Sequence, residues 1–247
     1  MIVLLLLFAA AFGGGALNAL AGGGTFLTFP ALVFAGVPPI MANATSAIAT
    51  MPGYVASVAA THRDAGPVGA ASVPQLSLVA LIGGIAGAVL LLVTPSRVFS
   101  FVVPWVLLAA TLLFAAGPSL LRRQRGGTAA GLGTVAATIL AISTYGGYFN
   151  GGLGILLLAA LGLLGLADIH RMNALKNLLS AVLSVVSVAT FAAAGIVVWR
   201  DALLMAAAAA LGGYCGAHWG RRVPQRALRL TIVAIGAVLT ALFFRRL

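Results

Sequence analysis

The chain has 247 residues, of which 62% are hydrophobic and only 7% are charged, and its net charge is +11. Soluble domains carry roughly 25% charged residues, so this composition excludes an ordinary soluble domain and selects an integral membrane protein. The basic residues form short clusters between long apolar runs, which is typical of cytoplasmic loops and not of a nucleic-acid-binding face. Because the apolar runs lack the alternation of barrel strands, the predicted fold class is all-α and polytopic.

Eight apolar segments follow one another along the chain, and a membrane-spanning helix needs about 20 such residues. We place them at residues 1–34, 38–61, 66–93, 97–121, 128–166, 172–198, 202–219 and 227–244. The first run has no basic residue before it and many segments follow it, so we interpret it as a membrane segment and not as a signal peptide.

The first and fifth segments are too long for one straight span. A helix of about 34 residues would extend about 50 Å, against an apolar core of about 30 Å. Each contains a glycine cluster, Gly22-Gly23-Gly24 in the first and Gly151-Gly152 with Gly154 in the fifth. Since glycine weakens a helix interior by about 1 kcal/mol, we predict a break or a re-entrant turn at each cluster. Close helix packing through small residues is the alternative.

The two halves of the chain resemble each other. At a shift of 130 residues Asn43 falls on Asn173, and at a shift of 129 Gly83-Gly84 falls on Gly212-Gly213. Further pairs are Gly22 with Gly152, Ser57 with Ser187, and Ala65 with Ala194. We therefore predict two homologous repeats with a transport site at their interface. The predicted boundaries are 1–121 for the first repeat, 122–127 for a basic linker and 128–247 for the second repeat.

The direction of the repeats has two solutions. If each broken segment crosses the membrane once, the repeats are parallel and the basic residues divide about equally between the two sides. If each re-enters without net crossing, the repeats are inverted and most arginines share one side, as the positive-inside rule requires. We favour the inverted arrangement, in which the opposite side carries Arg97, Arg200, Arg245 and Arg246.

Isolated polar residues inside membrane segments are costly and usually face a cavity or another helix. Lys176 is the only lysine, and its counterpart at the 130-residue shift is Ser46. Lys176 either snorkels to the headgroups or attracts an anionic substrate. The three aspartates lie in the loops and glutamate is absent, so no buried carboxylate is available to bind sodium or relay protons. A small anion therefore fits the chain better than a cation.

We expect the substrate to bind between the two breaks and the polar residues beside them. Hydroxyls and amides near the N-terminus of a broken helix suit an anion, because free N–H groups and the positive dipole end point into the gap. A hydrogen bond between helices is the alternative role of any single Thr or Asn. The predicted set is Gly22, Gly23, Gly24, Thr25, Asn43, Thr45, Ser46, Tyr148, Asn150, Gly151, Gly152, Gly154, Asn173, Lys176 and Asn177. No motif predicts a catalytic residue, a metal or a cofactor.

Two ordered motifs resemble the sulfite exporter TauE/SafE family, also called the toluene-sulfonate uptake permease family. The first comprises the glycine-rich run at 22–30 and Ala42-Asn43-Ala44-Thr45-Ser46. The second comprises the run at 146–154 and the segment 170–177, which ends in Ala-Leu-Lys-Asn where Gly-Thr-Ser is commoner. The resemblance spans essentially the whole chain. It implies about eight helices in two repeats, and transport of sulfite, sulfonates or related anions across a bacterial inner membrane.

The sequence thus predicts a secondary transporter of a small anion, sulfite or an organosulfonate, that works by alternating access between two repeats. The alternatives are an uptake permease or channel-like carrier for another small organic acid, and a non-transporting membrane scaffold. Paired breaks argue against the scaffold, because packing alone does not need them. The expected partners are the substrate and the lipid bilayer, without nucleic acid, and assembly into a homodimer is left open.

Overall fold

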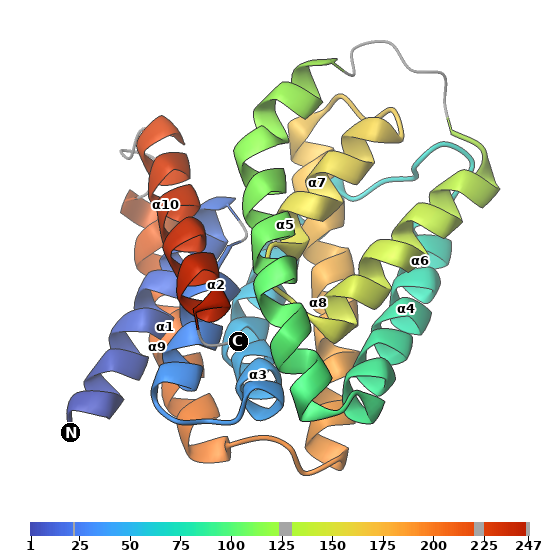
Figure 1. Cartoon of the computed structure of the whole chain (residues 1–247). Helices are drawn as coiled ribbons and strands as arrows, with labels where there is room; N and C mark the ends of the chain where they lie inside the picture. Colours follow the sequence, from blue (N-terminus) through green and yellow to red (C-terminus); the bar gives the residue numbers. More distant parts are fainter. Residues whose placement is uncertain (22, 124–129, 220–224, 246–247) are drawn as a thin grey trace.

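The structure is a computed structural model that describes residues 1–21, 23–123, 130–219 and 225–245 (Figure 1). Between its connecting loops this part of the chain is α-helical, apart from one 3₁₀ turn, η1, and an isolated β-bridge between Val68 and Ala71. The long helices are α1 (Ile2–Ala21), α3 (Pro39–Thr61), α4 (Val73–Val93), α5 (Ser96–Arg123), α6 (Leu132–Tyr148), α8 (Ile169–Ala193), α9 (Trp199–Trp219) and α10 (Gln225–Phe244). The short helices are α2 (Thr25–Phe34) and α7 (Leu153–Leu163), and η1 spans His62–Asp64. The predicted all-α, polytopic class is confirmed.

Within the described part, three helices, α1, α4 and α8, are each long and apolar enough to cross a membrane. Shorter apolar stretches lie in α2, α5, α7 and α10. The outer face of α4 shows what surrounds the bundle, because Leu78, Ile82, Val89 and Val93 are all exposed there. Lipid tails are as apolar as these side chains, so such a face is stable only within a bilayer.

Both predicted breaks are present in the structure. α1 ends at Ala21 and α2 begins at Thr25, and α6 ends at Tyr148 and α7 begins at Leu153. Gly152 caps α7 with φ +75°, in the left-handed region that glycine adopts without a steric penalty. Gly22, which we placed at the first break, lies outside the described residues.

Two predicted boundaries are wrong. Residues 66–72 form a loop, and α4 begins only at Val73, after a capping box between Ser72 and Gln75. α8 ends at Ala193 and not at 198, because the chain turns at Gly195 with φ +68°. In both cases an apolar stretch continues past a turn, so hydropathy alone does not mark the boundary.

Each broken segment folds into a helical hairpin. A Cβ at Gly24 would lie 2.6 Å from the carbonyl oxygen of Gly14, so α2 returns directly along α1. A Cβ at Gly146 would likewise lie 2.7 Å from a methyl group of Leu153, which places α7 against α6. In Figure 1 the N-terminus and the α2–α3 connection accordingly lie at the same, lower end of the molecule.

The two halves begin at opposite ends of the bundle. α1 starts at the lower end in Figure 1 and α6 starts at the upper end. The upper connections touch one another, since the Arg171 guanidinium at the start of α8 donates a 3.1 Å hydrogen bond to Pro67 O in the α3–α4 loop. At the lower end, Val198 N–H in the α8–α9 connection donates to the Thr45 hydroxyl near the start of α3.

The helices of one half pack against those of the other. α1 lies along α9 and α6 lies along α4, while α3 packs on α8 and α5 packs on α10. Exchanging α1–α5 with α6–α10 converts the α1–α9 contact into the α6–α4 contact and leaves the α3–α8 and α5–α10 contacts unchanged. Glycines allow the closest approaches: a Cβ at Gly216 would lie 2.7 Å from Ala16, and one at Gly83 would lie 2.7 Å from Ser143.

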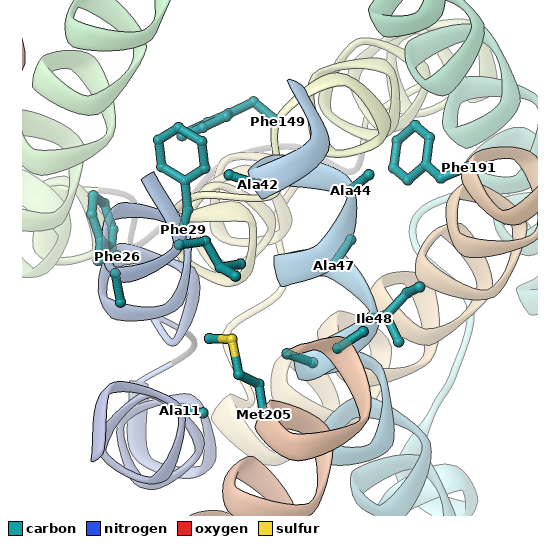
Figure 2. Packing of buried hydrophobic residues seen from close by; sticks show 14 of the residues in the cluster. Ala11, Phe26, Phe29, Ala42, Ala44, Ala47, Ile48, Phe149, Phe191 and Met205 are labelled. Atoms are coloured by element: carbon teal, nitrogen blue, oxygen red, sulfur yellow. The ribbon is translucent and has the colours of Figure 1, made fainter. Parts of the chain in front are cut away.

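Buried side chains form two apolar clusters on either side of the α3–α8 contact. The first joins α2 and α3 to the second break and to α8 and α9, and Figure 2 shows Phe26, Phe29, Ile48, Phe149 and Met205 from it. The second lies between α4, α6, α7 and α8, and its members include Leu76, Ile139, Leu157, Leu175 and Leu183. The broken helices therefore lie inside the packed bundle.

Candidate functional site

Two polar residues of α3 hold the second break. The Asn43 amide donates a 2.9 Å hydrogen bond to Tyr148 O, the last carbonyl of α6. About two turns further along the same face of α3, Thr50 Oγ1 accepts a 3.4 Å hydrogen bond from the Asn150 amide. Asn43, Thr50 and Asn150 are all buried, so α3 satisfies backbone and side-chain groups that the interrupted helix leaves free.

The start of α2 lies beside the same break. The Thr28 and Ser46 hydroxyls share a 2.6 Å hydrogen bond that joins α2 to α3. A Cβ at Gly152 would lie 3.6 Å from the ring of Phe26, so the first turn of α2 faces the N-terminus of α7. The structure thus brings together Asn43, Ser46, Tyr148, Asn150, Gly151 and Gly152 from the predicted set; we call this group the break cluster. Thr25, which also belongs to the predicted set, is buried in the first turn of α2.

The break cluster contains polar atoms without a protein partner. The Oδ1 atoms of Asn43 and Asn150 are buried, and within the described residues neither has a hydrogen-bond partner. Leaving such a group unsatisfied costs about 1–3 kcal/mol, and polar groups inside a membrane usually face a ligand, water or another helix. These oxygens can only accept hydrogen bonds and so suit a donor such as water, whereas the second N–H of each amide is the group that can donate to an anion.

The second predicted polar group, Asn173, Lys176 and Asn177, lies apart from the break cluster. The Asn177 amide donates a 3.4 Å hydrogen bond to Thr61 at the upper end of α3. Thr61 follows Ser46 by 15 residues, which corresponds to about 22 Å along a helix. The structure therefore places Lys176 near the upper end of α8 and does not bring it into the break cluster.

Lys176 is buried inside the bundle, with 7% of its surface exposed. All three aspartates belong to the described residues, and within that part no carboxylate lies within ion-pair distance of the ammonium group. Asp64 lies in η1, Asp168 caps α8 by accepting from His170 N–H, and Asp201 lies in the first turn of α9. The prediction that all three lie in loops is thus wrong for Asp201, by one helical turn.

Three buried serines on α8, Ser180, Ser184 and Ser187, were missed by sequence reasoning. Their exposed fractions are 0%, 1% and 3%, and their hydroxyls have no hydrogen-bond partner in the described part of the chain. They follow Lys176 at i+4, i+8 and i+11, so all four residues share one helix face. We call this face the polar stripe of α8. Its spacing from Lys176 was the signal available in the sequence.

The remaining predicted residues lie outside the break cluster. The Thr45 hydroxyl accepts from Val198 N–H, so it anchors the α8–α9 connection. Gly23 O accepts from Phe26 N–H in the turn between α1 and α2, and Gly24 makes the close approach to α1. Gly154 is buried in the first turn of α7, and Asn173 is half-buried on α8. Within the described residues, no three His, Cys, Asp or Glu side chains gather into a metal-binding group.

Comparison with known proteins identifies the family. The family model described as "Sulfite exporter TauE/SafE" matches residues 7–243. The chain is 28% identical over 243 residues to a probable membrane transporter protein of Haemophilus influenzae, covering 97% of this chain and 93% of that protein. It is 24% identical over 237 residues to the probable membrane transporter protein ORF9 of a Sinorhizobium species, covering 96% and 90%. It is 27% identical over 240 residues to the probable membrane transporter protein YfcA of Escherichia coli, covering 95% and 87%.

No solved structure gives a significant match. The family match covers nearly the whole chain, and the apolar helical bundle is what a multi-pass membrane transporter requires. The chain therefore belongs to the sulfite exporter TauE/SafE family of membrane transporters.

Proposed function

We propose that the protein is a secondary transporter of a small anion, sulfite or an organosulfonate, which works by alternating access between two inverted repeats. The observation that carries this proposal is the break cluster. α3 of one half holds the broken helix of the other half, and the Asn43 and Asn150 amide nitrogens, which each donate one hydrogen bond there, have a second N–H that can donate to an anion. A packing scaffold gains nothing from such atoms, whereas a binding site uses them.

The charge distribution favours an anion. A buried ammonium group without a carboxylate is expensive, and Lys176 has no acidic neighbour among the described residues. An anion would complete the site, and serine hydroxyls suit anions because they donate hydrogen bonds without bringing a competing negative charge. The N-terminus of α7 adds the positive end of a helix dipole at the second break.

The route that we propose runs from Lys176 along the polar stripe of α8 to the break cluster. Lys176 attracts the anion near the upper end of the bundle. Ser180, Ser184 and Ser187 carry it inward, and the amides of the break cluster bind it beside the N-terminus of α7. Asn173 and Asn177 flank the entrance.

The helix packing supports alternating access between inverted repeats. α1 and α6 start at opposite ends, and each pairs with a helix of the other half, so one half can rock against the other around α3 and α8. Arg63, Arg122, Arg123 and Arg171 belong to the upper end of the bundle. By the positive-inside rule this end faces the cytoplasm, in the inner membrane of a bacterium. Assembly into a homodimer stays a prediction.

The test is flux into proteoliposomes. Purified protein is reconstituted, and uptake of labelled sulfite and of labelled organosulfonates is measured with and without an imposed proton gradient. Saturable flux of one of these anions above that of empty liposomes is expected. Absence of flux for both, in protein that binds neither, would contradict the proposal. Saturable flux of a carboxylate alone would favour the organic-acid permease instead.

A further inference from the structure

A cavity of about 420 Å³ lies between α1, α3 and α9, outside the predicted set of site residues. Small side chains leave it open: Gly15, Ala19, Gly53, Ala56, Ala209 and Gly213 are among those that line it. Asn18, Thr50 and Ser57 are its polar members, together with Tyr214, and no charged side chain of the described residues lines it. An uncharged chemical group is therefore the kind of ligand that its walls accept.

In the second half a leucine occupies the equivalent place. At the 130-residue shift Gly53 corresponds to Leu183, and at the 129-residue shift Gly84 corresponds to Gly213. Leu183 is 1% exposed, and a Cβ at Gly84 would lie 3.1 Å from the Leu183 Cβ. Leu183 thus fills the space beside Gly84, whereas the equivalent space between Gly53 and Gly213 stays open.

The cavity adjoins the break cluster through Thr50. This residue lines the cavity and also accepts the hydrogen bond from Asn150. On the opposite wall the Asn18 Oδ1 atom is buried and has no hydrogen-bond partner among the described residues. Thr50 is thus the residue that the cavity and the break cluster share, and Asn18 lies on the α1 side of the same cavity.

We propose that the cavity binds the uncharged organic body of the transported anion, and that Gly53 determines how large this body can be. The inference rests on the proposed function, since the break cluster would hold the anionic group. Ligand pockets for organic molecules have volumes of roughly 300–1,000 Å³, within which this cavity falls. An inorganic oxyanion fills only a small part of it, so the cavity selects substrates with an organic body.

The test copies the residue of the second half into the first. A Cβ at Gly53 meets only the Asn18 amide, at 3.5 Å, so Gly53→Leu places its branched end in the cavity without disturbing the backbone. The probes are labelled sulfite and labelled benzenesulfonate in proteoliposomes. Gly53→Leu is expected to lower benzenesulfonate flux at least about tenfold while sulfite flux stays within about twofold, since one methylene in a pocket is worth about 10- to 200-fold. Gly53→Ala should give an intermediate loss.

The matched control is Gly133→Leu, because Gly133 is an exposed helical glycine with no atom near its Cβ position. It should leave both fluxes unchanged. The assignment would be overturned if Gly53→Ala lost both fluxes equally. It would also be overturned if a well-inserted Gly53→Leu kept full benzenesulfonate flux, which would mean that lipid fills the cavity. Wild-type flux of sulfite without any of benzenesulfonate would overturn it too and leave the proposed function standing.

Discussion

The two halves of the protein share their packing and differ where a ligand would touch them. At equivalent positions the first half has Gly53 and Ser46, and the second has Leu183 and Lys176. The cavity therefore lies against α1 and α3 of the first half, with α9 as its third wall, and the second half contains the only lysine. The glycines of the close helix contacts, in contrast, occur in both halves, at Gly83 and Gly87 and at Gly212 and Gly216.

This difference shows which constraints each half retains. A glycine at a helix contact cannot change without separating two backbones, so packing keeps both copies alike. Positions that face the interior of the transporter have no such constraint. We infer that the first half shapes the uncharged part of the site and the second supplies its charge. The following experiments test this comparison, beginning with the largest expected effect.

Equivalent residues of the two halves should be accessible from opposite sides of the membrane. Ala65→Cys and Ala194→Cys are placed separately in a Cys215→Ser background, which removes the only native cysteine. In intact cells a membrane-impermeant maleimide should label the cysteine at 194 fully and the one at 65 only after permeabilisation. The expected result is all-or-none, because the proposed repeats are inverted and the proposed orientation has the arginine-rich end facing inward. Labelling of both from the same side would contradict the inverted arrangement.

Replacing the glycine that caps α7 should abolish transport. Gly152→Leu puts a side chain on a residue with φ +75°, which costs about 1–2 kcal/mol, and places its Cβ 3.1 Å from that of Ala110. The leucine would also cover the N-terminus of α7, so flux should fall to background while membrane insertion is retained. Gly133→Leu controls for the insertion of a leucine into a helix. Normal flux in Gly152→Leu would exclude a site at this break. Gly23→Leu tests the first break in the same way.

Removing the charge of Lys176 should weaken substrate affinity by about 10- to 100-fold, because a hydrogen bond to a charged group contributes about 1.5–3 kcal/mol. Lys176→Met tests this in a flux assay at varied substrate concentration. Lys176→Arg should restore affinity only in part, since a planar guanidinium presents a different geometry from an ammonium group. Arg97→Met, which removes an exposed cation at the opposite end, is the control. Wild-type affinity in Lys176→Met would remove this residue from the route.

The smallest effect is expected on the polar stripe of α8. Ser184→Ala removes one hydroxyl that has no partner in the described protein, so affinity for the anion should fall about 2- to 10-fold, as for a single neutral hydrogen bond. Protein stability should not fall, because no intramolecular bond is lost. Ser100→Ala is the control, since its hydroxyl donates to Ser96 O on the surface of α5. Unchanged affinity in Ser184→Ala would place the route elsewhere.

The breaks and the helical class could be predicted because they depend on local properties. Excess segment length and clustered glycines identified the ends of α1 and α6 correctly. That Asn43 and Lys176 lie apart could not be predicted. A constant offset between repeats shows that two residues are equivalent, and it does not show that they are close in space. In an inverted pair, residues at the same offset lie towards opposite ends of the bundle, as Ser46 and Lys176 do on α3 and α8.

The cavity could not be predicted from the sequence either, and the serines only in part, because their spacing from Lys176 was visible but their lack of hydrogen-bond partners was not. A cavity results from the side chain that Gly53 lacks, and a glycine in a helix equally well permits close packing. The serines at 180, 184 and 187 resemble ordinary helix hydroxyls, which bond to the preceding turn, as Thr190 does with Val186 O. Only the structure shows that these serines do not.

The pairing of α1 with α9 has a consequence for how the protein is made. Trp199, where α9 begins, lies 178 residues after Ala21, where α1 ends, whereas α6 begins 39 residues after α4 ends. At about 5–20 residues per second, a ribosome needs roughly 10–35 s to reach α9 after completing α1. During this time the glycine face of α1 has no α9 to cover it. A nascent chain that stops before α9 therefore leaves its first helix without its main neighbour, which makes this helix the natural point at which membrane quality control would recognise an unfinished transporter.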